Sequence, residues 1–277
     1  MTTTRKTQIG LVVTALVLFV LLFIAPKKNS GKSAEEESVS ETVKPSANIE
    51  SFLNMALKTM KPEQKTAYET LLASAKASKA DTGLATVVGF WDQQKRPDFA
   101  AYFVEQIAGK KNTSEAYIKA GDRYYYSVRF IRDANEVPSL YASAMRCYQK
   151  ALDKEPANTE AKIQLAACMV EEGKDPMKGI GLLREVEKTD SNNVKLQLTF
   201  AFFSVRSQQW DRAIKRFNKV LSIDPLYIEA YLHLADAYEQ QGQKDKTIEM
   251  LEKYASLTDD AMAKQEVLKY IEQLKNK

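Results

Sequence analysis

The chain has 277 residues, of which 44% are apolar and 27% are charged, with a formal net charge of +4. This composition suffices for a buried core, and it lacks the concentrated basic field that nucleic-acid backbones require, so we expect no nucleic-acid partner. Glycine (10 residues) and proline (8 residues) are scarce, which favours helices.

A short basic tail, residues 1–8, precedes an uncharged apolar run at residues 9–25. At about 1.5 Å per helical residue, this run is at the short end for crossing a hydrocarbon core of ~30 Å. A signal peptide is the alternative reading. However, Phe23 stands two residues before Ala25 and Pro26 follows it, so the run ends without a small-x-small cleavage pattern. We therefore expect an uncleaved, single transmembrane helix.

The basic residues that flank this run do not fix its orientation. Arg5 and Lys6 stand before it and three lysines follow it closely, which leaves the positive-inside count nearly balanced. The short basic tail fits a signal anchor with the tail in the cytoplasm and the C-terminal part across the membrane. A cytoplasmic C-terminal part stays the alternative. Residues 26–47 are rich in Ser, Lys and Glu, which predicts a flexible linker.

The next segment, residues 48–113, predicts two pairs of helices. The first pair covers residues 48–60 and 62–78, where Pro62 suits the first turn of the second helix. Residues 82–109 predict the second pair, which has the pattern of a degenerate repeat unit.

Two later segments repeat each other. Residues 115–124 (EAYIKAGDRY) and 229–238 (EAYLHLADAY) are identical at five of ten positions. Each is followed by the spacing small-x3-aromatic-x2-small-x4-Pro. This spacing occurs as Ala144, Tyr148, Ala151 and Pro156, and again as Ala213, Phe217, Val220 and Pro225. These residues resemble the second helix of the tetratricopeptide repeat (TPR) family.

The resemblance places four TPR units in residues 114–260. Their starts lie near Ser114, Thr159, Val194 and Ile228, and the last two starts are 34 residues apart, which is the family's unit length. The first unit carries about eleven extra residues near Pro138, which rules out a continuous helix there. In the second unit, Gly179 and Leu183 stand in for the small and the aromatic residue. The family's first-helix tryptophan is absent.

This resemblance implies an all-α fold, in which the transmembrane helix is followed by a right-handed α-solenoid of helical hairpins. Residues 261–277 are expected to form its C-terminal capping helix. A small residue recurs at one place in each predicted first helix, as Gly121, Ala166, Ala201 and Ala235. At that place a small side chain would let the two helices of a unit approach closely.

Residues that carry catalysis or bind metals are few. No phosphate-binding glycine loop and no H-E-x-x-H motif occurs. Cys147 and Cys168 are read as small buried hydrophobes, although their pairing stays open, and His233 as a partly exposed helical histidine. We therefore expect no enzyme, no catalytic residue, no cofactor, no metal and no small-molecule substrate.

In the TPR family, the first helices line a concave surface on which ligand peptides lie. Carried over to this chain, the resemblance predicts a protein-binding groove made of Ile118, Asp122, Tyr125, Ile163, Ala167, Val170, Leu198, Phe202, Val205, Leu232, Asp236 and Glu239. Ile163, Leu198 and Leu232 replace the cations with which some TPR proteins hold a C-terminal carboxylate, so no carboxylate clamp is expected. A mostly apolar groove suits a hydrophobic peptide or an amphipathic helix. The alternative is that the array itself covers Leu198, Phe202 and Val205.

The resemblance thus implies a scaffold that binds other proteins and is held in the membrane through residues 9–25. Its plan resembles bacterial single-span TPR proteins. That likeness implies the bacterial inner membrane, with the C-terminal domain in the periplasm and an accessory role in assembly, chaperoning or secretion. A cytoplasm-facing membrane adaptor or receptor with the same binding mode is the alternative, and an enzyme is the weakest hypothesis.

Overall fold

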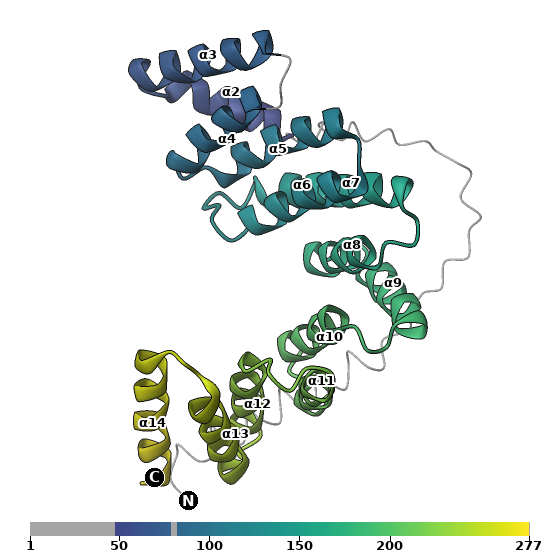
Figure 1. Cartoon of the computed structure of the whole chain (residues 1–277), viewed down its shortest axis with the longest axis vertical. Coiled ribbons are helices and arrows are strands. Elements are labelled where there is room, and N and C mark those ends of the chain that lie inside the picture. The colour runs from purple at the N-terminus through teal and green to yellow at the C-terminus, as the bar shows by residue number, and fades with distance from the viewer. Residues whose placement is uncertain (1–47, 79–81, 277) are drawn as a thin grey trace, which may run out of the picture. The chain divides into compact units, whose positions relative to one another are not determined.

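The computed structural model describes residues 48–78 and 82–276, which are helices joined by short loops (Figure 1). The helices are α2 (Ile49–Thr59), α3 (Pro62–Ala77), α4 (Thr82–Gln93), α5 (Pro97–Lys111), α6 (Ser114–Ser127), α7 (Val137–Lys154), α8 (Thr159–Glu172), α9 (Pro176–Thr189), α10 (Val194–Arg206), α11 (Trp210–Ile223), α12 (Glu229–Gln240), α13 (Lys244–Leu257) and α14 (Ala261–Lys275). Within these residues the expectation of an all-α fold is confirmed.

The apolar run at residues 9–25 and the linker at 26–47 lie outside the described residues. Among the helices that the structure does describe, none has the length and apolar character needed to span a membrane.

Side-chain caps mark the starts of several helices. The side-chain oxygen of Thr113 accepts a hydrogen bond from the Ala116 amide at the start of α6, and Asn158 and Asn193 do the same at α8 and α10. Such caps satisfy amides that have no partner inside the helix. The helices α6, α8, α10 and α12 begin at or next to the four repeat starts expected from the spacing.

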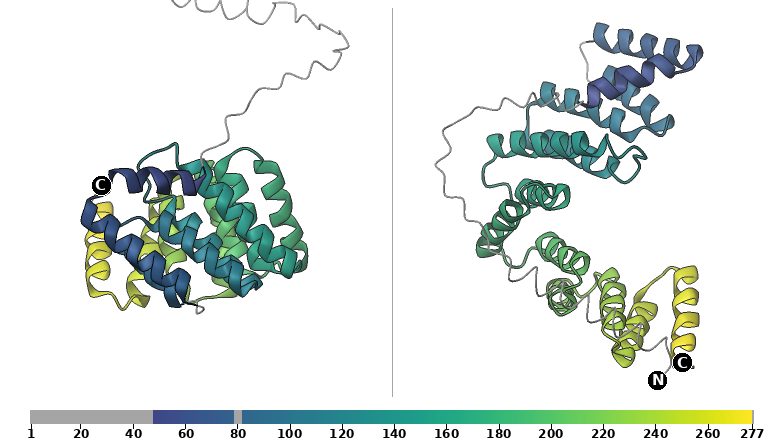
Figure 2. Two further views of the ribbon diagram at one scale, coloured as in Figure 1. Left: turned by 90° about the horizontal axis from the view of Figure 1, so that it is seen from above. Right: turned by 180° about the vertical axis from the view of Figure 1, so that it is seen from behind.

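Consecutive helices pack as hairpins, α6 on α7, α8 on α9, α10 on α11 and α12 on α13 (Figures 1 and 2). Small residues stand where the two helices of a hairpin come closest. A Cβ added to Gly179 would lie 2.6 Å from the carbonyl oxygen of Ala166, well inside van der Waals contact. Ala201 and Ala235 occupy the place of Ala166 in the two later hairpins, and both are buried. Close helix approach thus depends on these side chains.

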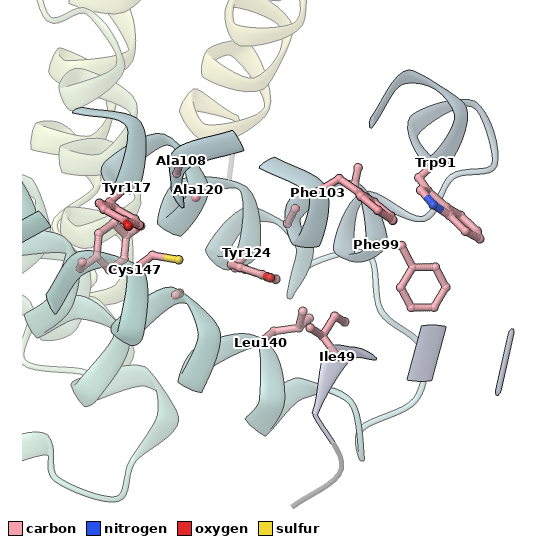
Figure 3. Packing of buried hydrophobic residues seen from close by; sticks show 14 of the residues in the cluster. Ile49, Trp91, Phe99, Phe103, Ala108, Tyr117, Ala120, Tyr124, Leu140 and Cys147 are labelled. Carbon is pink, nitrogen blue, oxygen red and sulfur yellow. The ribbon is translucent and has the colours of Figure 1, made fainter. Parts of the chain in front are cut away.

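The largest core cluster fills the N-terminal hairpins from α2 to α8 (Figure 3). Trp91 packs edge-on against Phe99 with ring centroids 4.9 Å apart, an arrangement that aromatic pairs favour. Cys147 and Tyr117 belong to the same cluster. Both Cys147 and Cys168 are buried and free, so the reading as small core residues is confirmed and the two do not form a disulfide.

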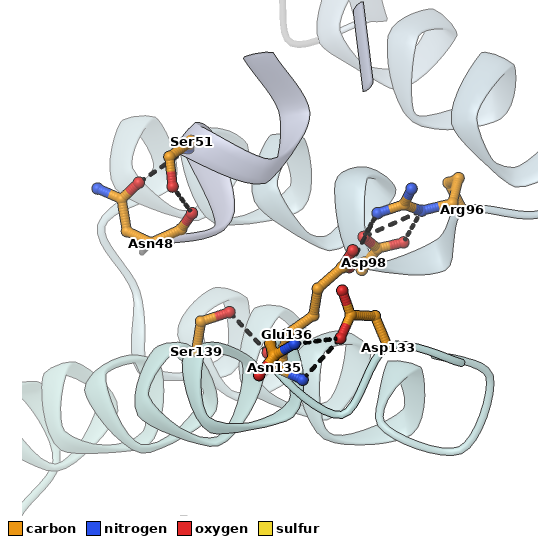
Figure 4. A network of polar contacts seen from close by, with 8 residues as sticks. All are labelled: Asn48, Ser51, Arg96, Asp98, Asp133, Asn135, Glu136 and Ser139. Carbon is orange, nitrogen blue, oxygen red and sulfur yellow. Dashed lines mark hydrogen bonds and ion pairs between the residues drawn. The ribbon is translucent and has the colours of Figure 1, made fainter. Parts of the chain in front are cut away.

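The extra residues of the first unit form the loop 128–136, because Pro138 enters the first turn of α7 and α6 ends at Ser127. A polar network fixes this loop to the start of α5 (Figure 4). The guanidinium of Arg96 donates to the buried carboxylate of Asp98 at 2.6 and 2.9 Å, and to Glu136 Oε2 at 3.0 Å. Removing Arg96 would leave the buried carboxylate of Asp98 without a compensating charge. The network therefore holds the loop against the folded helices.

Candidate protein-binding surface on the first helices

Some of the residues predicted to line the groove are buried in the structure. Ile163 is 0% exposed, because it packs with Leu183 of α9 and Leu196 of α10 in a small cluster. Ile118 is 7% exposed within the N-terminal core, and Ala167 of α8 is buried as well. These side chains hold hairpins together and present almost no area to a partner.

The polar residues of α6 are engaged by neighbouring helices. Asp122 Oδ1 accepts hydrogen bonds from Tyr148 Oη of α7 and Gln164 Nε2 of α8, both at 2.8 Å. Tyr125 Oη donates to Glu171 Oε1 at 2.6 Å. These bonds join α6, α7 and α8 into one connected unit.

Tyr141 of α7 completes this connection, because its hydroxyl donates to the second carboxylate oxygen of Glu171 at 3.1 Å. Burial raises the pKa of the Tyr125 hydroxyl, and the bond to the Glu171 carboxylate raises that pKa further. Burial and the same carboxylate raise the pKa of the Tyr141 hydroxyl as well, so both hydroxyls stay protonated donors. Val170 of α8 is half-buried and packs close to Gly179. A Cβ added at position 179 would lie 2.8 Å from Val170 Cγ2.

The residues of α10 form the most accessible apolar part of the predicted groove. Leu198 and Val205 are half-buried against the cluster of Ala201 and Phe217. Phe202 is 43% exposed. The array thus covers Leu198 and Val205 in part and leaves much of the Phe202 ring open.

Phe202 is held in place by two rings from the next helices. Its ring meets Phe217 of α11 edge-on at 5.7 Å and His233 of α12 edge-on at 5.0 Å. His233 in turn stacks on Phe217 at 5.1 Å with an interplanar angle of 20°. An exposed ring whose position is fixed in this way loses little further freedom when a partner packs on it.

His233 was not among the predicted groove residues. The signal for it was available, because it stands three residues before Asp236 and so shares a face of α12 with a residue that was included. Its expected character is confirmed, since the side chain is half-buried. Burial lowers the pKa of His233, and the opposing effect of the nearby Asp236 and Glu229 carboxylates is smaller. The ring is therefore neutral near pH 7.

The C-terminal end of the predicted groove lies beside α14. Leu232 is half-buried against the cluster of Ile271 and Leu274, and Glu239 accepts a hydrogen bond from the Tyr270 hydroxyl. Asp236 is exposed. The accessible part of the prediction, together with the histidine, is called the α10–α12 surface below. It consists of Leu198, Phe202, Val205, His233, Asp236 and Glu239.

Within the described residues, no group of three or more His, Cys, Asp or Glu side chains could hold a metal ion. The two thiols lie in the core, and burial raises the pKa of both. The chemistry that the α10–α12 surface offers is therefore contact with apolar side chains, aromatic rings and carboxylates.

Two family models match the C-terminal part of the chain. One, described as TPR repeat, covers residues 205–242, and the other, described as Tetratricopeptide repeat, covers residues 229–257. No curated protein sequence matches. Together the two matches span residues 205–257, where the chain is similar to tetratricopeptide repeats.

A solved tetratricopeptide repeat structure has a similar fold, and two further TPR structures match the chain less closely. A tetratricopeptide repeat protein from Parabacteroides merdae ATCC 43184 is 14% identical, covers 82% of this chain and 84% of its own, and has a TM-score of 0.52. TTC0263, a thermophilic TPR protein in Thermus thermophilus, is 14% identical over 70% of this chain and 98% of its own, with a TM-score of 0.49. YrrB, described as a TPR protein with an unusual peptide-binding site, is 19% identical over 73% of this chain and 98% of its own, with a TM-score of 0.42.

Proposed function

We propose that this tetratricopeptide-repeat chain is a membrane-anchored scaffold that binds a peptide or amphipathic helix of a partner protein on its α10–α12 surface. The observation that carries the proposal is the Phe202 ring, which stays 43% exposed although two neighbouring rings hold it in place. Fixed, partly exposed aromatic side chains are frequent energetic centres of protein interfaces.

The surroundings of Phe202 support a protein partner. Leu198 and Val205 extend the apolar area along α10, and the carboxylates of Asp236 and Glu239 border it on α12. An apolar centre with a polar rim is the usual composition of a protein interface. The apolar stripe along one helix suits an occupant that is itself extended or helical.

The apolar run at residues 9–25 supports the membrane part of the proposal. With the short basic tail in the cytoplasm, the repeats would lie in the periplasm of a bacterial cell and assist assembly, chaperoning or secretion of envelope proteins. A cytoplasm-facing adaptor is the alternative. Fusions of alkaline phosphatase and of green fluorescent protein to the C-terminus distinguish them, because the first is active only outside the cytoplasm and the second fluoresces only inside it.

The binding surface is tested by site-specific photocrosslinking in intact cells. A benzoylphenylalanine placed at position 202 is expected to cross-link to a discrete partner. The same group at Leu226, which is exposed in the turn before α12, serves as the control. Affinity capture from detergent-solubilised membranes with Phe202→Asp and Leu226→Asp variants gives an independent readout. Equal recovery of partners by two folded variants would contradict the proposed surface.

A further inference from the structure

The helix α12, which forms one side of the α10–α12 surface, is acidic, and its carboxylates form no ion pair with the residues that the structure describes. The helix α12 carries Glu229, Asp236 and Glu239 and has no lysine or arginine. Among the ion pairs that the described residues form, none includes any of these three carboxylates. The hydrogen bond that Glu239 accepts comes from the neutral hydroxyl of Tyr270, which leaves the negative charge in place.

On α6 and α8, the exposed acidic side chains at the helix starts form ion pairs. Glu115 of α6 pairs with Lys119 at 2.6 Å, and Glu160 of α8 pairs with Lys195 of α10 at 2.8 Å. Asp122 accepts two hydrogen bonds inside the array, and so does Glu171. Asp122 and Glu171 are half-buried, whereas Glu229, Asp236 and Glu239 are exposed. Among the helices α6, α8, α10 and α12, exposed carboxylates without an ion pair therefore occur on α12.

The acidic and apolar parts of the surface are contiguous. The His233 ring touches Phe202, and the charges of Asp236 and Glu229 act on the same histidine. Tyr270 of α14, bonded to Glu239, also experiences the charge of Asp236. One side chain thus separates the exposed phenylalanine from a row of carboxylates that runs along α12.

We propose that the segment bound on the α10–α12 surface is basic, with an apolar residue that packs on Phe202 and lysines or arginines that pair with Glu229, Asp236 and Glu239. This inference rests on the proposed function and names the class of partner. Cationic side chains are the complement that unpaired carboxylates beside an apolar contact favour, and an acidic segment would be repelled. The same charge disfavours phosphates and anionic lipid headgroups as occupants.

The spacing suits a helix. Axes of packed helices lie about 8–10 Å apart, so a partner whose apolar residue rests on α10 reaches α12 with its long cationic side chains. On a helix, residues three and four apart are neighbours, at about 5–6 Å between Cβ atoms. We therefore expect the cations three or four residues from the apolar anchor.

The test measures binding of three synthetic amphipathic peptides to the full chain in detergent by fluorescence anisotropy. The peptides share one leucine face and differ only at the flanking positions, which are lysine, glutamine or glutamate. We expect the lysine peptide to bind at least tenfold more tightly than the glutamine peptide at low salt. The glutamate peptide should bind most weakly. The lysine advantage should shrink as salt is added, because exposed charges are screened.

Variants assign the effect to its residues. The triple variant E229Q, D236N, E239Q should lose the preference for lysine and keep the affinity for the glutamine peptide. The matched control E63Q, E69Q, E115Q changes the net charge equally at exposed positions of α3 and α6 and should keep the preference. The variant Phe202→Ala should weaken binding of both peptides.

The outcomes separate the two proposals. Equal affinity for the lysine and glutamine peptides, with loss of both on Phe202→Ala, overturns the basic partner and leaves the binding surface standing. An equal loss of preference in the control triple variant also overturns it, since net charge would then be the cause. Absence of any peptide binding, together with no cross-linking at position 202, overturns the proposed function itself.

Discussion

Gly121 of α6 lies directly under the ring of Tyr148 of α7, so closely that a Cβ at position 121 would be 2.6 Å from Tyr148 Cε1. The ring is fully buried, and its hydroxyl donates to Asp122, the next residue after the glycine. The close contact of the Tyr148 ring with Gly121 and the hydrogen bond from Tyr148 to Asp122 together fix how α7 packs on α6. Because Tyr148 cannot move without breaking its hydrogen bond, the contact has little room to adjust.

The substitution Gly121→Ala is therefore expected to destabilise the array. Overpacking a rigid core costs about 1–3 kcal/mol, which exceeds the gain of up to ~1 kcal/mol that alanine brings to a helix interior. Urea unfolding followed by circular dichroism measures the change. Gly181→Ala in α9 is the matched control, because a Cβ there would have no neighbour within 4 Å outside the adjoining residues of its own helix. It should stabilise by about 0.5–1 kcal/mol. Equal effects at both positions would disprove the close contact.

The two phenylalanines that meet beside His233 should differ in their effect on stability. Phe217 is fully buried, so Phe217→Ala is expected to cost about 3–5 kcal/mol. Phe202 is 43% exposed, and Phe202→Ala should cost about 1–2 kcal/mol because much of its apolar area already meets water. Thermal unfolding of both variants checks the order. If Phe202→Ala unfolds the chain, the ring is a core residue and its role in binding is lost.

Much of the fold follows from residue spacing, since the helices α6, α8, α10 and α12 begin at or next to the starts that the recurring small and aromatic residues predict. Exposure was harder to predict. Ile163 stands at a first-helix position that was expected to face a partner, yet Leu183 and Leu196 cover it. Whether such a residue is open depends on the size of side chains that stand 20 and 33 positions later in the chain, which the pattern of a single helix does not reveal.

The polar contacts of the surface were also not predictable from local pattern. The carboxylate of Glu171 accepts hydrogen bonds from the hydroxyls of Tyr125 and Tyr141, which stand 46 and 30 positions earlier in the chain. Glu172 stands next to Glu171 in the sequence, and the local pattern does not indicate which of the two carboxylates the tyrosines bind. The site prediction therefore named residues such as Tyr125 correctly as lying on the first helices but missed that neighbouring helices already bind them.

Glu105 should make stability depend on pH in the acidic range. Burial raises its pKa, but the hydrogen bond and charge of Arg146, the hydrogen bond of Tyr124 and the charge of Lys150 together lower it below the ordinary value of 4.5. A carboxyl with a lower pKa in the folded state contributes stability that is present above its unfolded pKa and is lost as pH falls through the folded one. The stabilisation should therefore decline as the pH drops below about 4.5.

The variant Glu105→Gln tests this dependence. It should be less stable than the natural chain at pH 7 and should lose less additional stability between about pH 5 and pH 3, because the titrating group is gone. Urea midpoints at a series of pH values measure both effects. Glu63→Gln, at an exposed position of α3, controls for the change in charge. Parallel pH profiles of Glu105→Gln and the natural chain would exclude the coupling of Glu105 to Arg146, Tyr124 and Lys150.

The two cysteines should be unreactive in the folded protein and reactive once it opens. Both are fully buried, and burial raises the pKa of each thiol, so the nucleophilic thiolate is scarce and shielded. Maleimide labelling followed by mass spectrometry should find no adduct on native protein and an adduct on each cysteine in urea. The order of labelling at intermediate urea reports which helix opens first, because Cys147 lies on α7 and Cys168 lies on α8. Simultaneous labelling is expected, since hydrogen bonds between α6, α7 and α8 join both helices into one connected unit. Labelling of Cys168 well before Cys147 would show that this unit opens at α8 and that the bonds to Asp122 and Glu171 do not hold it.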